Sequence, residues 1–196
     1  MTRSLIRPPN LRDLLLARSG LPLRVVAATV VVRSASPDDF AAVGELTVAA
    51  YGAAGLLDND EQYIDELRDA AHRAAADRTD LLVAVDRDGG RIVGSVTFVL
   101  PGSPFAELSG PAEAEFRHLA VDPEGRGRGV GELLVRACID RARQHGCEGM
   151  VLSTAPISHD AHRLYARLGF RRAPERDWWP APDFPLLAYE LPLPPR

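Results

Sequence analysis

The sequence predicts an α/β protein in which a mixed, mostly antiparallel sheet carries helices on both faces. Two observations support this fold class. Two early strands are joined by the turn "RDGG" (87–90), which indicates an antiparallel hairpin. Later, a strand, a glycine-rich loop, a helix and another strand follow in succession, which is the order of a crossover connection. We read the elements as β-α-α-β-β-β-α-β-α-β-β.

The first half of the chain begins this order with one strand and two helices. "TVVVRSA" (29–35) is the predicted first strand. Ser36 fits a helix cap, Pro37 fits the first helical position, and Asp38 and Asp39 favour a helix N-terminus. The helix that follows has helical spacing of its inward residues: Phe40, Val43, Leu46, Thr47 and Ala50. A second helix is predicted over 60–77.

The second half supplies the remaining strands and two helices. The predicted helices cover 129–145, with apolar residues at i, i+3, i+4, i+7 and i+8, and 158–169. Gly146 follows the first of these, where helices commonly end. A loop around Trp178 and Trp179 separates the last two strands. The strands are predicted at 80–86, 91–100, 113–121, 148–154, 170–175 and 185–191.

Composition bounds the class of protein. The chain has 196 residues, of which 46% are hydrophobic and 26% charged, which suits one globular domain. Its net charge of −4 gives no indication of a nucleic-acid partner. The chain contains no lysine, and this disfavours Schiff-base chemistry and Walker-type phosphate binding.

The two cysteines and the N-terminal segment indicate in which cellular compartment the protein is expected. Cys138 and Cys147 have neither metal-ligand spacing nor a disulfide framework, so we expect a reducing, cytoplasmic compartment. The apolar run 25–32 is too short to span a membrane, and no membrane association is expected. We interpret residues 1–28 as a loosely attached extension and 29–196 as one domain.

The stretch "RGRGVG" (126–131) is the most informative motif of the chain. It lies between a predicted strand and a predicted helix, whose first N–H groups are unpaired and carry the positive end of the helix dipole. Gly127, Gly129 and Gly131 leave those donors accessible, while Arg126 and Arg128 add positive charge. Together they predict a phosphate site. The alternative is a glycine-rich turn with solvated arginines.

The pattern excludes two familiar phosphate motifs and resembles a third. The dinucleotide fingerprint requires glycine where Val130 stands, and the Walker pattern requires a lysine. "LAVDPEGRGRGVGELLVRACIDRA" resembles the acyl-CoA pyrophosphate motif of the GNAT superfamily of N-acetyltransferases. "HRLYARLGF" (162–170) resembles that superfamily's second signature. The resemblance covers about residues 29–191, by element order as well as by motif.

The resemblance implies a GNAT-like sheet of about seven strands with about four helices, and an acetyl-CoA-dependent N-acetyltransferase. Acetyl would pass directly to a primary amine in a ternary complex, with acetyl-CoA as cosubstrate and no metal. An acyl-CoA-binding sensor without turnover is the alternative. The resemblance implies that the strand before the loop diverges from the next one. The residues that the resemblance implies for cosubstrate binding are Leu119, Ala120, Val121, Arg126, Gly127, Arg128, Gly129, Val130, Gly131 and Ser158.

Glu115 resembles the general base of protein-acetylating members, since it stands six residues before Val121. The period of two places Glu115, Arg117, Leu119 and Val121 on one face of the strand and His118, in a structural role, on the other. The alternative for Glu115 is a charge at the strand end, paired with Arg117.

Tyr165 is the second catalytic candidate. Its phenol is protonated at neutral pH and can donate a proton to a departing thiolate, which is the role the resemblance implies. The alternative is an ordinary packing tyrosine. Many family members carry asparagine seven residues earlier, where this chain has Ser158.

His159 and His162 have helical spacing, but no further metal ligands converge on them in sequence, so we interpret them as a solvated helix end. Trp178 and Trp179 either line an acceptor pocket or bury apolar area. Acceptor contacts are expected from 37–77, 101–112 and 177–185. The acceptor amine, a small molecule or a protein, stays open. Homodimers are common in this superfamily, and the residues leave the oligomeric state open.

Overall fold

The computed structural model describes residues 30–57 and 61–194, and in these ranges the predicted mixed sheet is confirmed. Eight strands, β1 to β8, pair in the order β1-β2-β3-β4-β5-β8-β6, with β7 paired to β8 off this path. Every pair is antiparallel except β4 with β5. The described residues form eight strands and five α-helices, close to the about seven strands and about four helices that the resemblance implies. The extension predicted at 1–28 lies outside the described residues.

The element bounds follow the sequence order. The strands are β1 (Val30–Ser34), β2 (Thr79–Asp86), β3 (Ile92–Val99), β4 (Glu113–Val121), β5 (Gly149–Thr154), β6 (Arg171–Arg172), β7 (Trp178–Ala181) and β8 (Phe184–Pro192). The α-helices are α2 (Phe40–Ala53), α3 (Glu61–Arg68), α4 (Ala70–Ala75), α5 (Val130–Gln144) and α6 (His159–Arg167). Short 3₁₀ turns cover Pro37–Asp39, Pro123–Gly125 and Pro174–Arg176.

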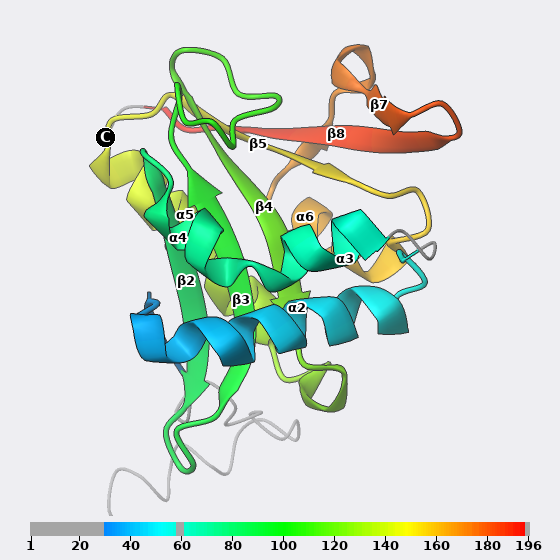
Figure 1. Ribbon diagram of the computed structural model, residues 1–196. Coiled ribbons are helices and arrows are strands. Elements are labelled where there is room, and N and C mark those ends of the chain that lie inside the picture. The colour runs from blue at the N-terminus through cyan, green and yellow to red at the C-terminus, as the bar shows by residue number, and fades with distance from the viewer. Residues whose placement is uncertain (1–29, 58–60, 195–196) are drawn as a thin grey trace, which may run out of the picture.

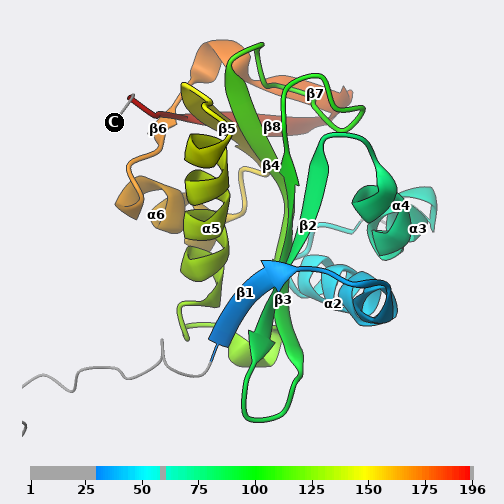
Figure 2. The same cartoon turned by 90° about the vertical axis from the view of Figure 1, so that its left-hand side faces the viewer.

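The sheet separates two helical layers. Helices α5 and α6 cover one face, and α2, α3 and α4 cover the other (Figure 2). The larger core lies under α5, where Leu134, Val135 and Cys138 are fully buried against the central strands. The sheet is strongly twisted, so that β8 runs almost across the direction of β2 and β3 (Figure 1). None of the helices in the described ranges is both long and apolar enough to cross a membrane.

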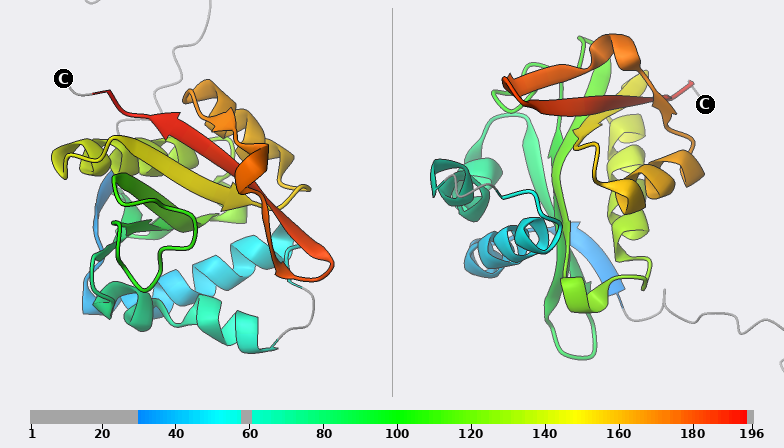
Figure 3. Two further views of the ribbon diagram at one scale, coloured as in Figure 1. Left: turned by 90° about the horizontal axis from the view of Figure 1, so that it is seen from above. Right: turned by 90° about the vertical axis from the view of Figure 1, so that its right-hand side faces the viewer.

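Two predicted elements differ from the structure. The helix expected over 60–77 is interrupted at Asp69, which leaves the helical conformation with ψ of 71° and caps α4 by accepting the His72 N–H at 2.9 Å. The loop expected around the two tryptophans is instead strand β7, which forms a hairpin with β8 and projects from the sheet (Figure 3). In both places the local sequence allows more than one conformation, and tertiary packing determines which one forms.

Close packing of α2 on its neighbours requires a glycine. A Cβ at Gly44 would collide with the backbone carbonyl of Arg68 at the end of α3. Because a carbonyl cannot move as a side-chain tip can, the absent side chain sets how near α3 lies to α2. This contact fixes the position of the α2–α4 layer, which carries several polar side chains discussed below.

Candidate active site

Strands β4 and β5 separate after a short parallel pairing. Only Glu113–Glu115 pair with Gly149–Val151, and within the described ranges no strand pairs with the β5 side of 116–121. Figure 1 shows the two strands diverging from this point. The separation leaves backbone donors and acceptors exposed along one edge of β4. It is the divergence that the family resemblance implies, and it includes the expected positions Leu119, Ala120 and Val121.

A β-bulge at His118 changes the faces on which the β4 side chains lie. His118 has a φ of 52°, and the register with β3 shifts between the Ser95 and Thr97 pairings. Phe116 packs on Tyr165 of α6, and Val121 lies against Gly131 of α5, so both lie on the α5–α6 face although five residues separate them. The expected single face for Glu115, Arg117, Leu119 and Val121 is therefore wrong, because the bulge inserts one extra residue.

The bulge also places His118 in the other layer. Its side chain is buried, and Nδ1 has no hydrogen-bond partner in the described part of the chain. Burial, together with the positive charges of Arg117 and Arg73, holds its pKa well below the ordinary value. The imidazole is therefore neutral at physiological pH.

The glycine-rich loop presents a row of free backbone donors. Gly129 begins α5 with a φ of 81°, and Leu133 is the first residue of the helix whose N–H bonds to a carbonyl, that of Gly129, at 3.1 Å. The N–H groups of residues 126–132 have no acceptor among the described residues. Seven consecutive free donors at a helix N-terminus are the groups on which the predicted phosphate site depends.

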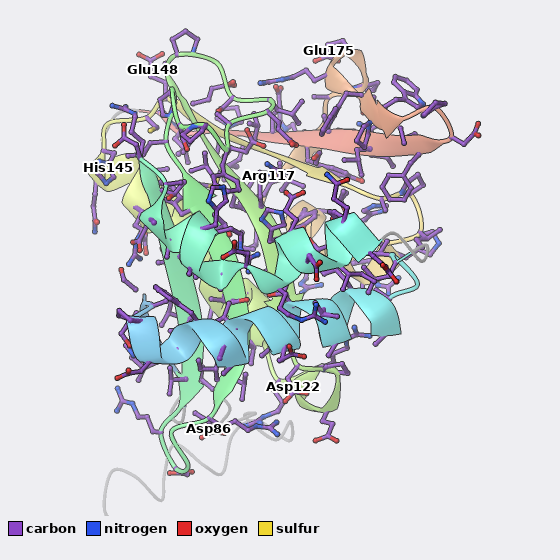
Figure 4. The ribbon with its side chains drawn as sticks, in the orientation of Figure 1. Asp86, Arg117, Asp122, His145, Glu148 and Glu175 are labelled. Atoms are coloured by element: carbon purple, nitrogen blue, oxygen red, sulfur yellow. The ribbon has the colours of Figure 1, made fainter. Side chains whose placement is uncertain are left out.

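The two loop arginines are held by protein groups. The Arg126 guanidinium donates to the carbonyl of Ala50 in α2 at 3.2 Å, and Arg128 pairs with Asp86 at 3.1 Å. Figure 4 labels Asp86 and Asp122 at the same end of the sheet. The Arg128 charge is thus paired, and the backbone donors are the groups left open to an anion. The sequence did not reveal either partner, because Ala50 and Asp86 are distant in the chain.

Glycine is required at two positions of the loop, Gly129 and Gly131, for different physical reasons. Gly129 occupies the left-handed region, and a Cβ there would meet no atom within 4 Å, so only backbone strain excludes a side chain. Gly131 is helical, but a Cβ would approach Leu164 Cδ2 of α6 at 3.3 Å and Val121 Cγ2 at 3.6 Å. It therefore permits the close approach of α5 to α6 and to the exposed edge of β4.

Tyr165 lies in the core on α6, beside the separated strands. Its side chain is buried, and its ring contacts Phe116, Phe170 and Tyr189 at centroid distances of 5.8–6.0 Å. Burial, with smaller contributions from Tyr51 and Tyr189, raises its pKa above the ordinary value for tyrosine. The phenol is therefore protonated at neutral pH, as a proton donor must be.

Glu115 is completely buried, and its carboxylate contacts backbone N–H groups of the loop before β4. Oε2 accepts the backbone N–H groups of Glu107, Leu108 and Ser109 at 2.9–3.1 Å, while Oε1 has no partner in the described part of the chain. The pairing with Arg117 is wrong, because Arg117 pairs with Glu107 at 2.7 Å. Glu115 thus anchors the loop between β3 and β4.

The start of α6 holds the remaining expected residues. Ser158 stands at the N-cap and its carbonyl accepts the His162 N–H at 3.0 Å, but its hydroxyl caps no donor. His162 Nε2 lies 3.1 Å from the Ala155 carbonyl, and His159 is exposed. The described residues contain no group of three His, Cys, Asp or Glu side chains placed to hold a metal ion.

The α2–α4 side of β4 holds a polar cluster whose individual residues were not predicted from the sequence. Arg117 pairs with Glu107, and Tyr51 and Tyr63 contact edge to face at 6.4 Å. Figure 4 labels Arg117 between α3 and the region where β4 and β5 separate. Tyr51 and Tyr63 belong to the segment 37–77, and Glu107 belongs to 101–112, two of the three segments from which acceptor contacts are expected. On the third predicted segment, Trp179 is 59% exposed.

The separated strands, the donor-rich loop and the buried tyrosine form the arrangement of the acyltransferase class. The chain belongs to the acetyltransferase (GNAT) family, whose sequence pattern matches residues 42–170. A probable N-acetyltransferase family 8 member 5 of Mus musculus is 35% identical over 89 residues, which are 45% of this chain. The chain spans only 37% of that relative's length.

Solved structures share the fold over most of the chain. A GCN5-related N-acetyltransferase from Kribbella flavida is 26% identical, with a TM-score of 0.63, over 85% of this chain and 99% of that one. The PaiA N-acetyltransferase from Thermoplasma acidophilum, solved in complex with coenzyme A, is 15% identical, with a TM-score of 0.65, over 84% and 99%. At that identity the likeness is one of fold.

Proposed function

We propose that this chain is an acetyl-CoA-dependent N-acetyltransferase that passes the acetyl group directly to a primary amine. The observation that carries the proposal is the row of seven free N–H groups over 126–132 at the end of a strand whose edge is unpaired. The row suits the pyrophosphate of coenzyme A, and the unpaired edge of β4 suits the amide groups of its pantetheine arm.

The donor set fits the cosubstrate in both chemistry and position. A pyrophosphate needs many hydrogen-bond donors and compensating positive charge, which the loop N–H groups, the α5 dipole and the nearby Arg126 guanidinium supply. The thioester carbonyl would then lie along β4, where a backbone N–H can polarise it. We also propose that Ser158, at the N-terminus of α6, contacts the cosubstrate.

The transfer step requires two proton movements. The amine nitrogen attacks the thioester carbon, the carbon–sulfur bond breaks, and the sulfur leaves with the electron pair. Tyr165 is the proposed acid that protonates this sulfur, and its raised pKa keeps the proton on the phenol until then. The nitrogen loses its surplus proton, which restores the tyrosine.

Two measurements test the proposal. Calorimetric titration with acetyl-CoA should show saturable binding, and addition of an acceptor amine should release free thiol in proportion to acetylated product. Binding without thiol release across a broad panel of amines would favour the sensor alternative. Absence of binding would reject the proposed function altogether.

A further inference from the structure

The polar cluster on the α2–α4 side of β4 carries an inference about the acceptor, which rests on the proposed function. We propose that Glu107 binds the ammonium group of a cationic amine without a neighbouring carboxylate and accepts its proton. Glu115 is then a positioning residue, which holds the loop that carries Glu107.

The two glutamates have opposite environments. Glu115 is inaccessible, and one of its oxygens is occupied by three N–H groups. Glu107 exposes 28% of its side chain, and only Oε1 is engaged, by Arg117. Its second oxygen has no partner within the described ranges, so it remains open to a ligand. Of the two, only Glu107 can touch an acceptor from solvent.

The Glu115 contacts explain how Glu107 is placed. The first of the three N–H groups on Glu115 Oε2 belongs to Glu107 itself, at 3.0 Å. Arg176 adds a second support by donating to the neighbouring carbonyl of Leu108 at 2.7 Å. A loop held at both its donors and its acceptors keeps the Glu107 side chain in one position, which proton transfer requires.

The charges of the cluster favour a cation. Glu107 interacts electrostatically with Glu66, Glu115 and Arg117, and Arg73 interacts with Glu66 and Asp69. Four carboxylates face two guanidiniums, so the net charge of the cluster is negative. An ammonium ion reduces this negative charge, whereas a zwitterionic amino acid, with no net charge, would bring a carboxylate beside Glu107 and Glu66.

Buried atoms without partners also indicate a polar occupant in this layer. Arg73 is 1% exposed and donates through Nη1 to the carbonyls of Glu66 and Leu67, but its Nε and Nη2 have no partner in the described residues. Glu115 Oε1 is likewise buried and unpartnered. Such atoms in a native interior are expected to meet water or a ligand.

Two tyrosines give the acceptor site an aromatic wall. The rings of Tyr51 and Tyr63 meet edge to face at 6.4 Å, and Tyr63 interacts electrostatically with Glu107. Aromatic faces bind ammonium groups and aromatic bodies alike. Tyr51 also interacts electrostatically with Tyr165, so the cluster lies near the proposed acid.

Burial and the neighbouring carboxylates Glu115 and Glu66 raise the pKa of Glu107, and Arg117 opposes this. A raised pKa makes the carboxylate a better proton acceptor. Tyr51, Tyr63, Asp69, Arg73 and His118 are further titratable and charged groups of this layer, and the ring of His72 contacts Phe105 of the same loop. In the deprotonation step, the ammonium R–NH₃⁺ gives one proton to the Glu107 carboxylate and becomes the free amine R–NH₂. Glu107 later passes the proton to solvent.

The test uses the whole chain with three related probes: phenethylamine, phenylalanine amide and phenylalanine. We expect the first two to be acetylated and phenylalanine to react at least about a hundredfold less efficiently, from like-charge repulsion. Glu107→Gln should lower kcat about 10²–10⁴-fold and remove the acid limb of the pH profile, while the acetyl-CoA Kd stays unchanged. Glu45→Gln, an isosteric change at an exposed site on α2, should leave all values unchanged.

The results that would contradict the Glu107 inference differ from the one that would contradict the proposed function. A preference for phenylalanine, or a Glu107→Gln variant with the wild-type kcat and pH profile, overturns the inference. So does failure of phenethylamine to bind or react in protein that binds acetyl-CoA. If acetyl-CoA itself does not bind, the proposed function fails instead. Glu115→Gln separates the two roles: we expect lower thermal stability, with the acid limb retained.

Discussion

At the scale of single residues, Tyr165 combines a packing role with a proposed chemical one. The ring belongs to an aromatic group with Phe116, Phe170 and Tyr189, so removing the ring would disturb the core. Removing only the hydroxyl separates the two roles. Tyr165→Phe should lower kcat about 10²–10⁴-fold, because a phenyl ring has no proton to give to the sulfur.

The same variant should keep its acetyl-CoA affinity and its melting temperature, measured by calorimetry, since phenylalanine fills the same space. Turnover close to wild type would show that water protonates the sulfur and that the tyrosine only packs. Loss of affinity together with turnover would show instead that the hydroxyl is structural.

Asp39 governs a second residue-scale property, the stability at low pH. Its carboxylate accepts from Arg33 at 2.6 Å and from the Ser36 backbone N–H at 2.7 Å. The Arg33 hydrogen bond is the main cause that lowers the Asp39 pKa, and burial opposes it. A depressed folded-state pKa stabilises the protein above the unfolded value of about 3.9, and this stability is lost as pH falls through the folded value.

Asp39→Asn should therefore lower the free energy of unfolding at pH 7 by about 1–2 kcal/mol, the smaller end reflecting the solvent exposure of Arg33. The difference from wild type should shrink below about pH 4, measured by urea denaturation at several pH values. A difference independent of pH would contradict the electrostatic origin.

At the scale of elements, the strand–loop–α5 unit depends on the left-handed conformation of Gly129. Gly129→Ala should cost about 1–2 kcal/mol of stability from backbone strain alone, since its Cβ meets no atom. It should also raise the acetyl-CoA Kd about tenfold or more, because relaxation of the loop displaces the N–H groups.

Gly146→Ala is the matched control, at the other end of the same helix. Its φ of 72° and its empty surroundings predict the same strain without any effect on acetyl-CoA binding. Denaturation and calorimetric titration of both variants check the pair. Equal affinities would remove the loop from the proposed binding site.

Elements with local signals were predictable from the sequence. The hairpin of β2 and β3, strand β4 and helix α5 lie within a few residues of the expected ranges, because periodicity and turn chemistry define them locally. The break at Asp69 was missed because the flanking residues all favour helix. The bulge at His118 was missed because nothing in an alternating strand marks where one residue is inserted.

The site was predictable only where a motif marks it. The loop 126–131 and Tyr165 stand in local patterns, so their positions beside the separated strands could be expected. The pairing of Glu107 with Arg117 joins a loop to a strand across the bulge, and a period of two assigns Glu115 that partner instead. Side-chain partners set by tertiary folding leave no trace in the spacing of residues.

At the scale of the whole molecule, the sheet separates the proposed acetyl-CoA site from the proposed acceptor site. The loop and Tyr165 belong to the layer of α5 and α6, and α2, α3 and α4 form the layer on the other face (Figures 2 and 3). The Glu107 cluster includes Tyr51 of α2 and Tyr63 of α3. The layers meet where β4 and β5 separate and at the Arg126 bond to the Ala50 carbonyl, and elsewhere the sheet lies between them. A change confined to one layer should therefore affect one substrate.

Gly44→Ala tests this division. The added Cβ collides with the Arg68 carbonyl, and α3 should yield rather than α2, because α2 packs directly on the sheet. We expect a loss of about 1–3 kcal/mol in the free energy of unfolding and a raised acceptor KM, because α3 carries Tyr63 and Glu66. The acetyl-CoA Kd should stay within about twofold, a free-energy change of only ~0.4 kcal/mol.

Gly52→Ala, on the same helix, controls for the effect of a methyl group. Its Cβ would make an ordinary contact with Leu57 Cδ1 at 3.6 Å, so stability should be unchanged or rise by up to about 1 kcal/mol. Denaturation, steady-state kinetics and calorimetric titration compare the two variants. If Gly44→Ala weakens acetyl-CoA binding as much as it raises the acceptor KM, the layers are mechanically coupled. The separation of substrates by the sheet would then be wrong.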